Sequence, residues 1–314
     1  GALWSSLFVA AGDVYLLGTS QQYGSIVIRR SRDNGRAWSD PHDEATGLLF
    51  RAGPFREPPN YHCAPTPVLL KDGRLYRAFE DCSPCTWGPG FQALVISADA
   101  GDDLLDARSW TMSEKLPFDP AWLPGDWGEV SGAGFLEGNV VDGPDGTLWN
   151  IMRLHPPPVT DKAAMLRILD HGRRLALDPA SAFIEFPGGM TKFTIRRDSG
   201  SGIYFTLSND VPPSPEVRRI VLEWNMFPRN RLSLYGSRDL RRWVHLRTLL
   251  TDDLPLSPEE SLQRTGFQYA DWQFDGPDIV AVVRTAYDGA PNLHDANRIV
   301  FLRVQDFRAQ ARAL

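Results

Sequence analysis

Long apolar runs, helical periodicity and cysteine are scarce in this sequence, and it carries no net positive charge. No run of eighteen apolar residues occurs, so we expect no membrane-spanning helix. The net charge of -6 argues against nucleic acid as a partner, because nucleic-acid-binding proteins need basic surfaces. Cys63, Cys82 and Cys85 are the whole cysteine set, and the sequence leaves their pairing open. Without a complementary ligand set they make no case for a metal site, so we expect no cofactor, although a structural ion is not excluded.

The residues that are plentiful favour many short strands joined by tight turns. Trp (10) and Phe (16) supply bulky packing material, while Gly (27) and Pro (25) supply turns. A phrase that starts with Gly, usually with Asp, and continues into a β-branched and aromatic run recurs at residues 11–17, 71–79, 144–151, 200–207 and 275–282. These five repeats predict five blades of an all-β propeller that occupies residues 1–314 as a single domain. The best helical signal is a capping box at residues 257–262.

Residues 31–38 read SRDNGRAW and match S-x-D-x-G-x-x-W, the Asp-box of sialidase-type β-propellers. Asp33 is expected to accept backbone N–H bonds across a turn between two outer strands. Gly35 permits a positive φ, and Trp38 is expected to pack back between neighbouring sheets. Residues 237–243 keep the Ser, Asp and Trp of the motif but lack its Gly. The motif stabilises a turn and contributes no catalytic group.

Polar residues beside the innermost strands are the catalytic candidates, because these strands line the central funnel of a propeller. His62 precedes an apolar strand and is the candidate general acid–base; the alternative is a loop imidazole bonded to backbone. His294 lies in an Asn/Asp-rich stretch, which a simple turn explains equally well. Arg153 and Arg284 end strands beside polar loops and suit bidentate binding of a carboxylate, or else form surface ion pairs.

Tyr269 completes the catalytic set. Glu137 and Asp271 are an alternative carboxylate pair for glycoside hydrolysis. The candidate substrate-binding residues share a position in polar segments next to the expected inner strands: Tyr61, Glu137, Asn139, Lys192, Gln268, Asp271 and Asn297. We expect His62, Arg153, Tyr269, Arg284 and His294 to converge on the funnel.

Six segments together resemble a sialidase-superfamily propeller group that contains α-L-rhamnosidases and L-rhamnose-α-1,4-D-glucuronate lyases. They are QQYG at 21–24, YHCAP at 61–65, LEGN at 136–139, FPGGMTKFTIR at 186–196, GFQYADW at 266–272 and HDAN at 294–297. The resemblance implies a family fold of six or seven blades, so that either the ring of this chain closes with five blades or an N-terminal blade is absent from it. It also implies activity on the side chains of arabinogalactan.

The leading hypothesis is therefore an enzyme that cleaves a terminal rhamnose–glucuronate linkage by β-elimination. A glycoside hydrolase of the rhamnosidase or sialidase type and a glycan-binding propeller without turnover are the alternatives. The expected partner is an anionic oligosaccharide or polysaccharide, bound by a monomer. Such a substrate implies an extracellular or periplasmic location.

Overall fold

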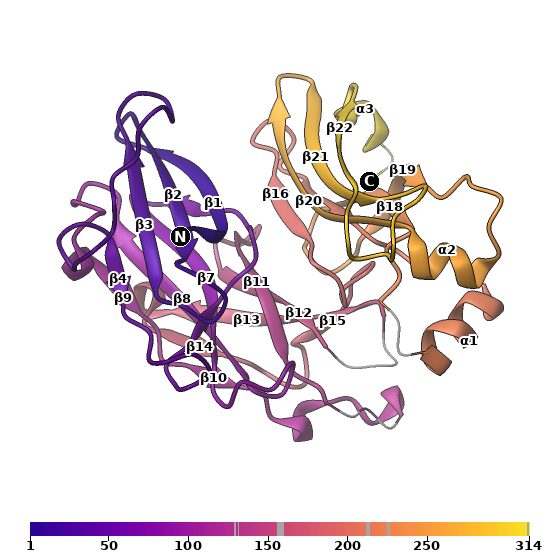
Figure 1. Ribbon diagram of the computed structural model, residues 1–314, viewed down its shortest axis with the longest axis horizontal. Helices are drawn as coiled ribbons and strands as arrows, with labels where there is room; N and C mark the ends of the chain where they lie inside the picture. The colour runs from indigo at the N-terminus through magenta and orange to yellow at the C-terminus, as the bar shows by residue number, and fades with distance from the viewer. Residues whose placement is uncertain (129, 131, 156–159, 212–213, 225–226, 313) are drawn as a thin grey trace. The chain divides into compact units, whose positions relative to one another are not determined.

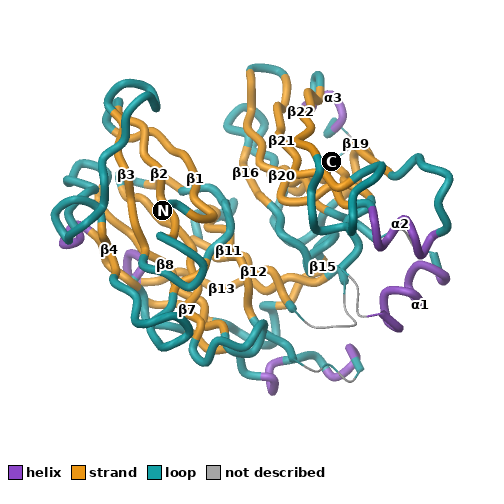
Figure 2. The backbone as a smooth tube through the Cα atoms, viewed as in Figure 1, coloured by secondary structure: helices purple, strands orange, loops and turns teal. Residues whose placement is uncertain are grey.

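The computed structural model describes residues 1–314 except 129, 131, 156–159, 212–213, 225–226 and 313. Five antiparallel sheets follow one another along the chain (Figure 1), and strands and loops dominate over helix (Figure 2). The described part of the chain contains no helix long and apolar enough to cross a membrane.

The first, fourth and fifth sheets are meanders of consecutive strands, whereas the second and third also contain strands outside such an order. The first sheet has the order β1 (Leu3–Ala10), β2 (Asp13–Thr19), β3 (Ile26–Ser31) and β4 (Leu48–Phe50). In the second, β7 (Arg74–Cys82) pairs with β5 (Tyr61–His62), β6 (Leu69–Lys71) and β8 (Phe91–Asp99), and β8 also pairs with β9 (Trp110–Met112) and β10 (Leu116–Pro117). The third sheet runs β11 (Phe135–Asp142), β12 (Leu148–Leu154), β13 (Lys162–Leu169) and β14 (Arg174–Ala176), and the short β15 (Phe183–Glu185) follows. The fourth runs β16 (Thr194–Arg197), β17 (Tyr204–Ser208), β18 (Arg231–Ser237) and β19 (Val244–Thr251). The fifth runs β20 (Gly266–Asp275), β21 (Asp278–Ala286) and β22 (Arg298–Val304).

The five recurrent phrases of the sequence lie at equivalent places. Each contains the turn of a hairpin that opens one of the five sheets, at β1–β2, β6–β7, β11–β12, β16–β17 and β20–β21. A glycine with positive φ is present in every one of these turns, as in Gly12 (φ 84°) and Gly146 (φ 81°). The prediction of five blades' worth of hairpins is therefore confirmed.

Helices occur between and after the sheets. They are α1 (Pro215–Trp224), α2 (Pro258–Arg264) and α3 (Phe307–Gln310), with 3₁₀ turns at Ala107–Ser109, Pro120–Trp122, Gly125–Trp127 and Asp170–Gly172. The predicted capping box is present at α2, where the Ser257 hydroxyl accepts from the Glu260 N–H and the Glu260 carboxylate accepts from the Ser257 N–H. The sequence did not predict α1.

The Asp33 turn joins the outer strands β3 and β4, as expected. Asp33 Oδ1 accepts the N–H groups of Arg36 and Ala37, and the Trp38 indole donates to the Gly35 carbonyl. Trp38 is half-buried over its own turn. Residues 237–243 repeat the arrangement between β18 and β19, where Asp239 Oδ1 accepts two successive backbone N–H groups.

The chain divides into two compact units, which are described separately. Unit 1 comprises residues 1–126, 132–155 and 164–182, and unit 2 comprises 127–131, 156–163 and 183–314. Fully buried side chains from β2, β3, β7 and β8 form the core of unit 1, among them Leu17, Ile28 and Phe79. In unit 2, Phe205 and Val283 pack with Phe307 of α3. The interpretation of residues 1–314 as one domain stays a prediction.

Cys82 and Cys85 form a disulfide within unit 1, and Cys63 is buried and free. The pairing that the sequence left open is thereby assigned.

Candidate functional site

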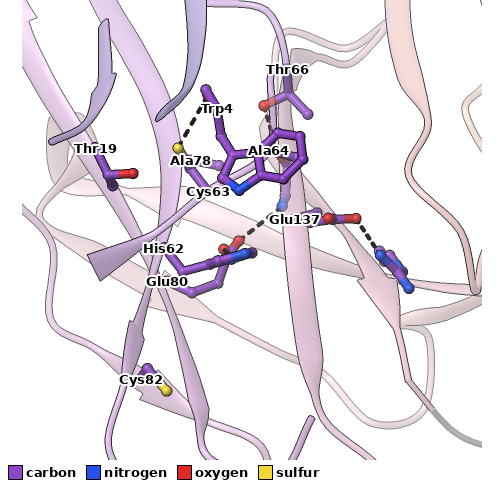
Figure 3. A network of polar contacts seen from close by, with 12 residues as sticks. Trp4, Thr19, His62, Cys63, Ala64, Thr66, Ala78, Glu80, Cys82 and Glu137 are labelled. Atoms are coloured by element: carbon purple, nitrogen blue, oxygen red, sulfur yellow. Dashed lines mark hydrogen bonds and ion pairs between the residues drawn. The ribbon is translucent and has the colours of Figure 1, made fainter. Parts of the chain in front are cut away.

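His62 ends β5 and has 4% of its side chain exposed. Its Nδ1 lies 3.0 Å from Oε2 of Glu80, the residue opposite it on β7 (Figure 3). Because a carboxylate oxygen only accepts hydrogen bonds, Nδ1 carries the proton and donates it to this bond. In the neutral imidazole the other ring nitrogen, Nε2, then holds the lone pair that a general base needs. His62 is thus bonded to a carboxylate, and the alternative of a loop imidazole bonded to backbone does not describe it.

Glu80 is completely buried, and both of its oxygens are engaged. Oε2 accepts from His62, while Oε1 accepts the backbone N–H of Gly138 on β11 at 3.1 Å. One carboxylate therefore holds the imidazole on the second sheet and the backbone of the third sheet at the same time.

A β-bulge places Glu137 next to this contact. In the β11–β12 pairing, Leu136 opposes Arg153 and Asn139 opposes Ile151, so Glu137 and Gly138 share one partner residue. Glu137 has a left-handed backbone (φ 45°). At Gly138 an added Cβ would lie 2.3 Å from Oδ1 of Asn150, so the close approach requires glycine.

Arg153 already has an internal counter-charge. Its Nη1 lies 2.5 Å from Oε2 of Glu137, and both side chains are at most 3% exposed (Figure 3). A buried guanidinium bonded to a carboxylate at this distance is expected to keep that partner. Arg153 is therefore a poorer candidate for a substrate carboxylate than the sequence suggested.

Tyr61 and Asn139 are buried next to these residues in the chain. Burial, and secondarily the Asp81 carboxylate, raises the pKa of Tyr61 to about 12, so its hydroxyl stays protonated at neutral pH. Lys115 forms an ion pair with Asp81 at 2.7 Å and lies over the Tyr61 ring.

Aromatic rings surround His62. The ring centroids of Phe91, Trp87 and Tyr23 lie 5.2, 5.9 and 6.3 Å from that of His62. Trp87 and Phe91 meet the imidazole edge-on. These apolar neighbours limit the water around His62.

The same bulge occurs in the first strands of the first and fifth sheets. Trp4 (φ 49°) and Tyr269 (φ 51°) hold the left-handed position that Glu137 holds in the third sheet, and a one-residue register shift occurs at each. Arg284 opposes the residue before its bulge, as Arg153 does. Bulges with a non-glycine residue in this conformation are strained and often re-aim a side chain at a functional site. Glu137 and Tyr269, two of the predicted site residues, therefore occupy equivalent positions in their sheets.

Tyr269 lies among cations in unit 2. The guanidinium carbons of Arg229 and Arg284 are each 5.5 Å from its ring centroid. Arg284 Nη2 donates to the His294 carbonyl and lies 3.3 Å from His294 Nδ1. Partial burial, and then Arg229 and Arg284, lower the pKa of His294. In the described parts of the chain Arg284 has no carboxylate partner, so this cluster suits an anion.

The other predicted binding residues of unit 2 support the local structure. Gln268 accepts from Arg229 and donates to the carbonyls of Leu293 and His294. Buried Lys192 donates to Thr194 Oγ1 and to the Ala270 carbonyl. The remaining two are Asp271, which pairs with Arg196 at 3.5 Å, and Asn297, which bonds to the backbone of Tyr287.

The structure thus brings the predicted residues together in two groups. His62, Glu137 and Arg153 are connected through Glu80 and Gly138 in unit 1, and Tyr269, Arg284 and His294 meet in unit 2. The convergence of both groups on one funnel stays a prediction. Among the residues that the structure describes, no group of three or more His, Cys, Asp or Glu side chains is arranged to hold a metal ion.

Sequence reasoning missed Glu80, Trp87 and Arg229. A partial signal was present for Glu80, because Arg77, Glu80 and Asp81 stand among Leu, Tyr, Ala and Phe in β7, and charged side chains that a strand buries require partners. Arg229 follows no motif, and its role depends on contacts to a distant strand.

No protein-family model and no curated protein matches the sequence. Similar solved structures include an exo-β-1,3-galactanase from Clostridium thermocellum, at 13% identity and a TM-score of 0.54, over 96% of this chain and 59% of that one. An α-L-arabinofuranosidase from Lactobacillus brevis is similar at 12% identity and a TM-score of 0.55, over 96% of this chain and 92% of that one. The Hadza microbial sialidase Hz136 is similar at 14% identity and a TM-score of 0.52, over 93% of this chain and 49% of that one. The chain therefore spans less than two thirds of the galactanase and of the sialidase.

At these identities the likeness defines the fold. The chain is an all-β protein with a five-bladed β-propeller fold.

Proposed function

We propose that this chain is a carbohydrate-active enzyme that cleaves terminal L-rhamnose-α-1,4-D-glucuronate linkages by β-elimination. The observation that carries the proposal is the buried pair of His62 and Glu80, in which the carboxylate fixes the imidazole with Nε2 available as a base. The likeness to a galactanase, an arabinofuranosidase and a sialidase supports a carbohydrate as the substrate. The segments that resemble rhamnose–glucuronate lyases support the linkage.

In this reaction His62 Nε2 removes the proton from C5 of the glucuronate. The electron pair left at C5 forms a C4–C5 double bond while the C4–O4 bond breaks. A second acid protonates the departing oxygen of rhamnose. A positioned general acid–base of this kind contributes about 10²–10⁴-fold to a rate.

A C5 proton becomes acidic enough to remove only when the uronate carboxylate is neutralised. Of the two arginines that the sequence nominated, Arg153 is bonded to Glu137, whereas Arg284 lies beside Arg229 and Tyr269 in a cationic cluster. We therefore propose Arg284 with Arg229, both in unit 2, as the group that binds a carboxylate, and their convergence with His62 stays a prediction. We further propose that the protein acts as a monomer on an anionic glycan and that it is extracellular or periplasmic.

Hydrolysis is the second candidate, since the similar structures are those of a galactanase, an arabinofuranosidase and a sialidase, which are glycosidases. Binding without turnover is the third. Incubation of the protein with rhamnose-terminated arabinogalactan side chains separates them. An unsaturated uronate that absorbs in the ultraviolet supports elimination, saturated sugars support hydrolysis, and saturable binding without products supports a lectin-like role.

A further inference from the structure

We propose that Trp87 forms a binding platform for a neutral pyranose ring next to His62. The proposal deepens the function proposed above, and it rests on the glycan substrate assumed there. A single exposed tryptophan needs no explanation in itself. Three features distinguish Trp87: the loop that holds it, the rings that orient it and the charge around it.

The loop between β7 and β8 is fixed at several points. The Cys82–Cys85 disulfide lies two residues before Trp87, and the backbone bonds from Ser83 N to Gly90 O (2.7 Å) and from Gly90 N to Thr86 O (2.9 Å) close the loop on itself. Behind it, an added Cβ at Gly88 (φ 83°) would lie 2.7 Å from the Gly132 carbonyl oxygen. A platform held in this way loses little conformational entropy when a ligand binds.

Three rings orient the indole. Phe91, His62 and His155 lie 5.4, 5.9 and 6.5 Å from it between ring centroids, each at an angle near 80°. Trp87 is nevertheless 41% exposed. A rigid, oriented and exposed aromatic surface is what the apolar face of a sugar ring can cover, and burying that surface favours binding.

The aromatic surface continues on the other side of His62. Tyr23 contacts the imidazole, and Phe55, which is 59% exposed, contacts Tyr23 at 5.7 Å. The candidate base thus lies within a row of rings that is exposed at both ends, Phe55 and Trp87.

Charge selects a neutral ring over a uronate at this position. Burial, and secondarily Arg153, lower the pKa of His155 to about 4, so His155 is neutral at pH 7. The guanidinium of Arg153 is bonded to Glu137, and Glu80 is bonded to His62. Arg153 is thus already bonded to a carboxylate, and a neutral sugar needs no counter-charge here, whereas a uronate does.

The test measures binding of methyl α-L-rhamnopyranoside and of sodium glucuronate by NMR titration. We compare the unmodified protein with Trp87→Ala, with Trp87→Phe and with the control Phe301→Ala, which removes a 63% exposed ring on β22. Loss of the indole should weaken rhamnoside binding about tenfold or more, the range for removing an aromatic anchor, while Trp87→Phe retains most of the affinity. Phe301→Ala should bind like the unmodified protein.

Rhamnoside binding by Trp87→Ala equal to that of the unmodified protein would overturn the proposal, as would binding of glucuronate but not of the rhamnoside. Should Trp87→Ala not fold, the indole signals of Trp87 in the unmodified protein decide: they must shift during the rhamnoside titration, and unchanged signals refute the platform. The product assay separates the two proposals. If rhamnoside binding depends on Trp87 but no cleaved product forms, the lyase proposal is refuted and the platform proposal stands. If turnover is unaffected by Trp87→Ala, the platform proposal is refuted and the lyase proposal stands.

Discussion

Replacing Glu137 by glutamine removes the negative charge from a buried ion pair, so that the guanidinium of Arg153 loses this counter-charge. Both side chains are at most 3% exposed and their charged atoms lie 2.5 Å apart, so solvent does not compensate the loss. Breaking a buried pair by changing one partner costs about 3–5 kcal/mol. Because glutamine keeps the shape of the side chain and one acceptor, we expect the lower end of this range, about 3 kcal/mol. Thermal unfolding followed by circular dichroism should then show a Tm lower by about 4–5 °C.

Glu185→Gln is the matched control. Glu185 pairs with Lys162, but its side chain is 76% exposed, so its loss should cost about 0–1 kcal/mol. Adding Arg153→Met to Glu137→Gln removes the buried positive charge as well and should recover much of the stability. A Tm for Glu137→Gln equal to that of the control would refute the reasoning, and Arg153 would again be a candidate for binding the substrate carboxylate.

Three further predictions concern separate parts of the chain. Arg284→Met should weaken binding of glucuronate at least about tenfold, whereas Arg303→Met, which removes a guanidinium paired with two surface carboxylates, should leave it unchanged in the same titration. His155 has a pKa of about 4 in the folded chain and about 6.5 when unfolded, so between pH 6.5 and pH 4 the unfolded state binds a proton that the folded state does not, and the free energy of unfolding falls with pH. Urea unfolding at pH 7 and at pH 4.5 should show a smaller fall in this free energy for His155→Phe than for the unmodified protein. Asp33→Ala should lower the Tm without changing turnover, because Asp33 accepts backbone N–H groups in an outer turn; a loss of turnover in a folded variant would contradict this role.

The sequence predicted the hairpins of this fold well because their signals are local. Glycine with aspartate at a turn, followed by β-branched and aromatic residues, needs no distant partner to be recognised. The Asp33 turn and the capping box of α2 were predictable for the same reason, since the residues that bond lie within four positions of one another. Helix α1 carries part of the same signal, Ser214 followed by Pro215 and Glu216, but Val217 stands where Glu260 completes the capping box of α2.

The candidate site was predictable only in its residue types. His62 and Arg153 were nominated because they end or precede strands, but their partners Glu80 and Glu137 follow from strand register. A one-residue bulge decides which side chain of β11 meets Arg153, and no pattern in the sequence marks that bulge. The contact of Arg229 with Tyr269 joins segments forty residues apart and depends on the tertiary fold.

The most direct test of the proposed function compares His62→Ala with the unmodified protein on a rhamnose-terminated glucuronate oligosaccharide, with unsaturated uronate followed by its ultraviolet absorbance. Loss of a general acid–base predicts turnover at least about a hundredfold lower in a variant that remains folded. Turnover of His62→Ala near that of the unmodified protein would contradict the assignment and make His294 the next candidate base. Release of saturated sugars by the unmodified protein would contradict elimination itself.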